Sequence, residues 1–278
     1  MTWMRNAALA AAASGLLAPQ VGARTPKEPT TVESEQPGVR IKSEFVSTAN
    51  ALLDKLGDTT KSSSLPGATD PTVRSYVAQT KVLTRTLGTP AVPAEDVNEV
   101  SSLCGPGIRV LVGYLLAGTG NQAAAKDTPP EELAAKLKEL GGKNVLRYPE
   151  VVLPGALFVE HCMAAYMPSV EATLAPVPKE RYNDQVRHGV AEIHKGDGDV
   201  IDGALTDIRD PGLSVEFRRQ SLDQLEIDWD NLVLALSSAQ RTELAHRLSD
   251  PGEDVIGARL KRLRERIGTV KCGALCQA

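Results

Sequence analysis

Apolar residues recur at three- and four-residue steps along this chain, which is the spacing that places side chains on one face of an α-helix. Two of these stripes lie toward the C-terminus and are Leu222, Leu225, Trp229, Leu232 and Leu236, and Ile256, Leu260, Leu263 and Ile267. No stretch alternates apolar and polar residues for long enough to require a sheet. The sequence therefore predicts an all-α fold, built as a bundle or array of helices.

Start and stop signals divide this fold into about eleven predicted helices, whose lengths are close to the average of about 11–12 residues. Asp70 can accept backbone N–H groups ahead of a helix that ends at Gly88, and further caps are predicted at residues 128–131 and 250–253. The Gly-Pro-Gly sequence at 105–107 is interpreted as a break between two helices, because proline removes a backbone N–H. The predicted helices begin near residues 44, 71, 94, 107, 129, 149, 178, 200, 214, 239 and 251.

The N-terminal residues have the three parts of a secretory signal peptide. Arg5 precedes an apolar stretch at 7–17, and residues 21–23 (Val-Gly-Ala) are typical of a cleavage site. The apolar stretch is shorter than the ~20 residues that a membrane-spanning helix needs. We therefore predict an exported protein, periplasmic or secreted, with a signal peptide at 1–23, a disordered leader at 24–40 and one helical domain at 41–278.

Charge and aromatic content exclude some classes of partner. The chain has a net charge of −4, and removing residues 1–23, whose only charge is Arg5, leaves 30 Lys and Arg against 35 Asp and Glu, a net charge of −5. Nucleic acids and anionic membranes attract clustered positive charge, so we expect no nucleic-acid partner. The aromatic content of 4% also argues against a stacking surface for sugars or single-stranded nucleic acid.

Four cysteines are present, and an exported chain with an even number of cysteines favours disulfides over a metal site. Cys104, Cys162, Cys272 and Cys276 allow three pairings. We prefer Cys104–Cys162 with Cys272–Cys276, whereas crossed pairings would join the C-terminal tail to the core. Each bridge is expected to serve stability, by about 2–4 kcal/mol. His161 precedes Cys162, but sequence neighbours on a helix point about 100° apart, so no His–Cys nucleophile is predicted.

One candidate catalytic group is the stripe of Asp184, His188 and Glu192. Their four-residue spacing places them on one helix face, where a carboxylate beside an imidazole can orient a general base. The alternative is an exposed helix face that carries charge pairs for solubility. That alternative is favoured, because the sequence supplies neither a nucleophile nor an oxyanion-stabilising loop.

A candidate calcium site is the sequence from 197 to 203, where Asp197, Asp199 and Asp202 alternate with glycines. Clustered carboxylates on a tight turn suit Ca²⁺, a cation that prefers oxygen ligands. The spacing departs from the EF-hand loop, because Ile208 occupies the position of its bidentate glutamate. The favoured alternative is that Asp199 caps the start of a helix.

The last predicted helix is basic, with Arg259, Lys261, Arg262, Arg264 and Arg266 against a single Glu265 in that stretch. Such a helix can bind an acidic partner or lie on an anionic membrane surface. We name Arg259, Arg262 and Arg266 as candidate partner-binding residues. The alternative is that these cations offset the helix dipole near its C-terminus while the apolar stripe fills the core.

The sequence carries no motif for a cofactor, nucleotide or catalytic nucleophile: G-x-S-x-G, H-E-x-x-H and the glycine-rich phosphate loops are missing. We therefore expect no cofactor and a non-enzymatic protein that binds a protein partner through a helical surface or groove. A hydrolase using His188 is the first alternative. A small-ligand carrier is the second, with a cavity lined by Tyr114, Phe158 and Met163 unless these three are ordinary core residues.

Overall fold

The computed structural model describes residues 37–57, 64–118, 143–145, 147–250, 252 and 254–277. Within these residues every regular element is a helix, and both preferred disulfides are formed, so the predicted all-α, disulfide-bonded fold is confirmed. The helices are α2 (Pro37–Leu56), α3 (Pro71–Thr86), α4 (Glu99–Leu115), α7 (Pro149–Leu174), the 3-10 helix η2 (Lys179–Arg181), α8 (Asp184–Arg209), α9 (Val215–Leu234), α10 (Ser238–Arg247), α11 (Val255–Ile267) and α12 (Ala274–Gln277).

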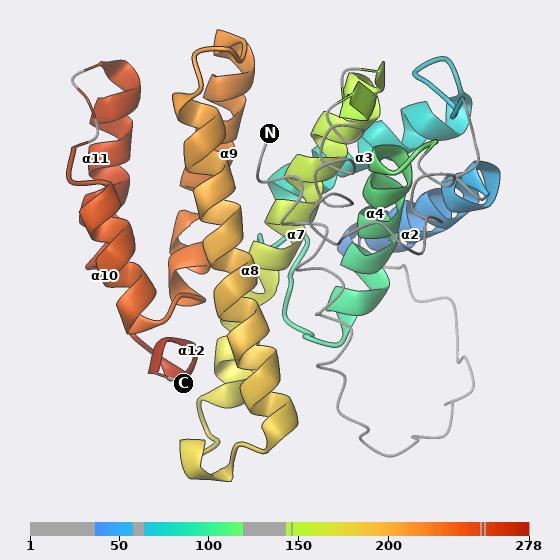
Figure 1. Cartoon of the computed structure of the whole chain (residues 1–278). Helices are drawn as coiled ribbons and strands as arrows, with labels where there is room; N and C mark the ends of the chain where they lie inside the picture. Colours follow the sequence, from blue (N-terminus) through green and yellow to red (C-terminus); the bar gives the residue numbers. More distant parts are fainter. Residues whose placement is uncertain are drawn as a thin grey trace, which may run out of the picture.

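Helix α7 is the central element of the fold. It contacts α3 and α4 on one side and α9 and α12 on the other, so it joins the N-terminal helices to the C-terminal ones (Figure 1). By length and composition alone, α7 could cross a membrane, but 72% of its most apolar stretch is buried inside the structure. This burial is what a core helix of a folded domain requires.

Two main hydrophobic clusters flank α7. The N-terminal cluster packs α2, α3, α4 and the first part of α7 around Phe45, Tyr76 and Phe158, all fully buried. Ring centroids in this cluster lie 4.6 Å apart for Phe45 and Phe158. The C-terminal cluster packs α8 to α11 around Trp229 and includes Ala164 of α7. Burying each large apolar side chain stabilises the fold by roughly 1.5–3 kcal/mol.

Several helix ends lie where local chemistry predicts them. Asp70 Oδ1 accepts from the backbone N of Thr72 (2.7 Å) and of Val73 (3.3 Å), as expected for the cap of α3. Gly88 follows that helix with a φ of 83°, a conformation that favours glycine. Two boundaries differ. Residues 37–40, predicted as leader, belong to α2, and the cap of α11 is Asp254 instead of residues 250–253.

The predicted break at Gly105-Pro106-Gly107 is wrong, because α4 continues through it. The two helices expected to begin near 94 and 107 are therefore one helix. A Cβ at position 107 would lie 2.6 Å from Phe158 Cε1, so glycine here lets α4 approach α7 closely. The Cys104–Cys162 disulfide joins the same two helices. This packing outweighs the loss of one helical hydrogen bond at Pro106.

A second predicted boundary, near residue 200, is also wrong. Helix α8 runs without interruption from Asp184 to Arg209, and only the 3-10 helix η2 forms near residue 178. Gly198 and Gly203 lie inside α8. Each glycine destabilises a helix interior by about 1 kcal/mol. Burial of the apolar face of α8 stabilises the helix by more than this.

Some sequence predictions concern residues outside the described part of the chain. These are the signal peptide at 1–23, the leader up to residue 36, and the helix expected to begin near 129.

Replacing Gly107 by alanine is expected to lower the free energy of unfolding by about 1–3 kcal/mol, because the added methyl overpacks the contact with Phe158. Gly105 in the same helix is the matched control, since a Cβ there meets nothing within 4 Å. Gly105→Ala should stabilise by roughly 0.5–1 kcal/mol. Urea unfolding of both variants measures the difference, and equal stabilisation by both substitutions would contradict the close approach.

Candidate functional site

The candidate catalytic stripe lies on the surface. Asp184 and His188 are exposed and Glu192 is partly exposed, all on α8 as predicted. Two surface grooves border α8 in the described part of the chain, and none of these three residues lines either one. A hydrolase site needs a concave pocket that excludes water around such groups. The stripe therefore has the geometry of a solvated helix face.

The candidate calcium residues lie in the middle of α8, so no loop forms around them. Asp197 is 7% exposed and points into the protein, whereas Asp202 forms an ion pair with Arg247 of α10. Asp199 cannot cap a helix here, because the helix begins fifteen residues earlier at Asp184. Among the described residues, no group of three or more His, Cys, Asp or Glu side chains is arranged to hold a metal ion.

The residues proposed for a carrier cavity are packed in the N-terminal cluster. Tyr114 and Phe158 have no exposed surface, and the partly buried Met163 packs against the same cluster. The Tyr114 hydroxyl donates to the Pro66 carbonyl oxygen at 2.6 Å. These are the contacts of ordinary core side chains, which was the alternative interpretation.

Two cations of the basic helix α11 form ion pairs with carboxylates of α9. Arg259 donates from Nε and Nη2 to the two carboxylate oxygens of Glu226 on α9, at 2.8 and 2.6 Å, and from Nη2 to Asp223 at 2.6 Å. Arg266 pairs with Asp230 of α9 at 2.9 Å. Of the three candidate partner-binding residues, Arg259 and Arg266 therefore orient α11 on α9, whereas Arg262 is exposed and forms no ion pair with any residue that the structure describes.

A buried charged pair joins α7 to α9. His161 Nδ1 lies 2.6 Å from Asp228 Oδ1, and His161 Nε2 lies 3.0 Å from the Leu87 carbonyl oxygen. Both neighbours are acceptors, so both ring nitrogens donate and the imidazole is protonated. Burial by itself lowers the pKa of His161, but the hydrogen bond and the charge of Asp228 outweigh it and raise that pKa above 6.5. Gln224 donates to the second Asp228 oxygen at 2.7 Å.

Two further carboxyls are buried near this pair. Glu160 is 3% exposed, and burial together with the charges of Asp228, Asp207 and Asp197 raises its pKa well above the usual value. Burial also raises the pKa of Asp197 to about 8. At neutral pH the Asp197 carboxyl is therefore mostly protonated, and the pKa of Glu160 is shifted in the same direction.

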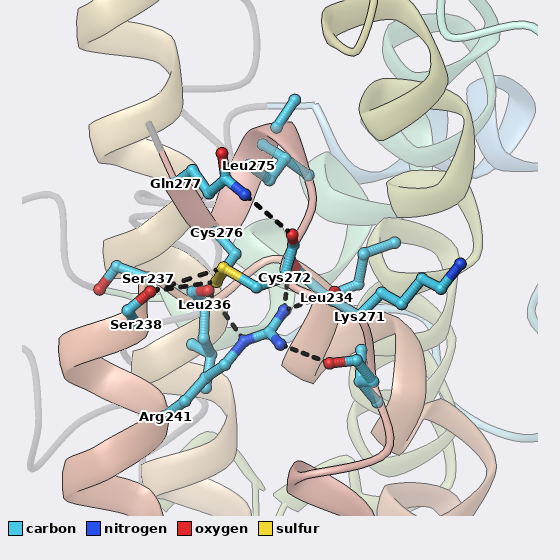
Figure 2. Close-up of a disulfide and its surroundings, with 12 residues drawn as sticks. Leu234, Leu236, Ser237, Ser238, Arg241, Lys271, Cys272, Leu275, Cys276 and Gln277 are labelled. Atoms are coloured by element: carbon cyan, nitrogen blue, oxygen red, sulfur yellow. Dashed lines mark hydrogen bonds between the residues drawn. A yellow bond between two sulfur atoms is a disulfide. The ribbon is translucent and has the colours of Figure 1, made fainter.

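The C-terminal loop carries the exposed disulfide. Cys272 and Cys276 are bonded four residues apart, and the Ser238 hydroxyl of α10 lies 3.5 Å from Cys272 Sγ and 3.4 Å from Cys276 Sγ (Figure 2). Cys272 is exposed, while Cys276 is 3% exposed. The Arg241 guanidinium lies beside this loop and donates to the Lys271 carbonyl oxygen at 3.4 Å. The two sulfurs thus lie against the first turn of α10.

Three side chains from other helices hold this loop. Glu171 of α7 accepts from the backbone N of Ala274 (2.6 Å) and of Leu275 (2.8 Å). His194 Nε2 of α8 donates to the Leu275 carbonyl oxygen at 2.8 Å. A Cβ at Gly273 would lie 2.1 Å from Glu171 Oε1, so glycine is required for the carboxylate to reach the backbone.

An open polar groove of about 440 Å³ lies between α8 and α10, next to this loop. Its lining includes His194, Lys195, Asp199, Asp202, Ser237 and Gln240. Gln240 joins the two helices across the groove by donating to the His194 carbonyl oxygen at 2.7 Å. The groove is too open to bury a small ligand.

No family model, curated protein or solved structure matches this chain. Its function is therefore inferred from its own side chains. The cysteines were identified from the sequence, but Ser238, Arg241 and Glu171 were not. No motif distinguishes these residues, which are 31 to 105 positions away from the cysteines in the sequence. The buried pair had one sequence signal, since Asp228 lies beside the apolar stripe of α9, three residues after Leu225 and immediately before Trp229.

Proposed function

We propose that this is an exported, non-enzymatic protein that binds an acidic protein surface through the outer face of α11. The observation that carries the proposal is the set of exposed cations Lys261, Arg262 and Arg264, which form no ion pair among the described residues. Arg259 and Arg266 hold this helix in place on α9, so the three free cations are presented by a rigid element. Export is supported by the signal-like N-terminus and by two disulfides, which persist in oxidising compartments.

A protein partner is favoured over a membrane surface. A helix that lies in a bilayer interface inserts its apolar face between the lipids. The apolar face of α11 is already used, because Leu260, Leu263 and Ile267 belong to the C-terminal hydrophobic cluster. Only the charged face is available, and its positive charge is complementary to an acidic protein surface.

Reversing the three free cations, as Lys261→Glu, Arg262→Glu and Arg264→Glu together, is expected to weaken binding to immobilised poly-L-glutamate about 10- to 100-fold at low salt. The protein is acidic overall, so retention on a polyanion requires a local basic surface. Salt-gradient elution measures the retention, and circular dichroism checks the fold. Arg259 and Arg266 are left unchanged, because their reversal would separate α11 from α9.

The matched control reverses three exposed cations of α3, namely Arg74, Lys81 and Arg85. This control changes the net charge by the same amount and should keep its retention. Equal loss in both triple variants, or no retention of the parent protein, would overturn the proposal. Stronger binding to vesicles of anionic lipid than to polyglutamate would overturn the proposed protein partner and indicate that α11 binds a membrane surface.

A further inference from the structure

The two disulfides of this protein have opposite surroundings. Cys104 and Cys162 are both completely buried in the N-terminal cluster, between α4 and α7. Cys272 is exposed to solvent at the C-terminal loop. Thiol–disulfide exchange requires direct approach of an attacking thiolate to a sulfur, so only Cys272–Cys276 is open to it in the folded protein.

The C-terminal disulfide is not needed to hold the loop in place. The carboxylate of Glu171, the imidazole of His194 and the guanidinium of Arg241 bind the loop backbone from three different helices. Leu275 is fully buried in a hydrophobic cluster with Met167 and Val170. These contacts persist when the sulfur–sulfur bond opens, so the two thiols would stay close together.

The cross-link also constrains the unfolded chain very little. Stabilisation by a disulfide grows with the logarithm of the number of residues it encloses. Cys272 and Cys276 are four positions apart, whereas Cys104 and Cys162 are 58 positions apart. A structural role therefore explains the buried bridge well and the exposed bridge poorly.

The surroundings of the C-terminal sulfurs favour a thiolate. The Ser238 hydroxyl is within 3.5 Å of both sulfurs and can donate a hydrogen bond to the one that becomes charged. Ser238 is the first residue of α10, whose N-terminal end carries a partial positive charge. Arg241, one turn further along α10, adds a full positive charge beside the loop.

We propose that Cys272–Cys276 is a redox-active disulfide that exchanges with the dithiol of a partner protein. A partner thiolate attacks the exposed Cys272 Sγ, a mixed disulfide forms, and Cys276 leaves as a thiolate that accepts a hydrogen bond from Ser238. The second partner thiolate then attacks the partner's own sulfur in the mixed disulfide and releases Cys272. Two electrons and two protons pass from the partner dithiol, which becomes a disulfide, to the Cys272–Cys276 pair. This activity is independent of the α11 surface.

The first test is reduction of the oxidised full-length protein by dilute dithiothreitol, with maleimide trapping and peptide mass spectrometry of each cysteine. We expect Cys272 and Cys276 to react at least about 100-fold faster than Cys104 and Cys162. The near-ultraviolet circular dichroism should stay unchanged while they do. Reaction of all four cysteines together, only as the dichroism is lost, would show two structural disulfides and overturn the proposal.

The second test concerns Ser238. In Ser238→Ala, reduction should slow by about 3- to 10-fold, and the pH profile for alkylation of the freed Cys276 should shift to higher pH. Ser43→Ala on α2, which removes an exposed hydroxyl that donates to the Arg40 carbonyl oxygen, is the matched control and should behave as the parent protein. If Ser238→Ala changes neither the rate nor the pH profile, the hydroxyl takes no part in the exchange step, and the proposed redox site is contradicted.

Discussion

Replacing Asp228 by alanine is expected to lower the free energy of unfolding by about 3–5 kcal/mol at pH 6, because it leaves a buried charged imidazole without its partner. His161 is held by Asp228 at 2.6 Å and by the Leu87 carbonyl, both inside the protein. Gln224 also loses its acceptor. Urea unfolding at several pH values measures the effect.

The pH dependence of this loss follows from the raised pKa of His161. A group whose folded pKa lies above its unfolded value stabilises the protein fully below the unfolded value, about 6.5, and loses that contribution as pH rises through the folded value. The difference between the parent protein and Asp228→Ala should therefore be largest at pH 6 and smaller at alkaline pH.

The matched control for Asp228 is Asp230→Ala on the same helix. Asp230 is largely exposed and pairs with Arg266, so its loss should cost less than about 1 kcal/mol. A double variant, His161→Leu with Asp228→Leu, should recover part of the stability lost in Asp228→Ala, since no buried charge remains. A loss below 1 kcal/mol for Asp228→Ala at pH 6 would contradict the charged pair.

Replacing Asp197 by asparagine is expected to stabilise the protein increasingly as pH rises, by on the order of 4 kcal/mol between pH 4 and pH 8. Burial raises the pKa of this carboxyl to about 8, whereas the unfolded chain titrates near 3.8. Between these values the folded protein retains a proton that the unfolded chain has released. The parent protein therefore loses stability through that window, and the asparagine variant, which has no proton to lose, does not.

The control for Asp197 is Glu192→Gln, on the same helix but partly exposed. Its unfolding free energy should stay within about 0.5 kcal/mol of the parent at every pH. Chemical unfolding at pH 5, 6.5 and 8 distinguishes the two. A constant difference between Asp197→Asn and the parent across this range would show that the Asp197 carboxyl titrates at its ordinary pKa.

Local signals in the sequence predicted the class of fold and several of its boundaries. Asp70 caps α3 and Gly88 follows it because both effects depend on residues within four positions of one another. The two helix breaks that were predicted inside α4 and α8 are wrong for the same reason. Gly105-Pro106-Gly107 and the glycines near residue 200 weaken a helix locally, but the packing of α4 and α8 against distant helices outweighs that weakness.

The candidate sites were predicted less well, because burial decides the role of a charged residue. Asp184 and Asp197 are both acidic residues of α8, yet one is solvated and the other is protonated in the interior. Arg259 and Arg262 are three positions apart on α11, yet only the first meets carboxylates of α9. Sequence spacing places residues on a helix face but does not show what that face meets.

The sequence by itself determined that this protein is helical and which apolar stripes face its core, because the helical repeat and capping involve near neighbours in the chain. It also favoured the pairing of Cys104 with Cys162 and of Cys272 with Cys276. Only the tertiary structure decided that the second pair lies exposed against Ser238, and that His161 is buried against Asp228. These contacts join residues 34 to 67 positions apart, and their energies depend on the exclusion of water that only the assembled helices provide.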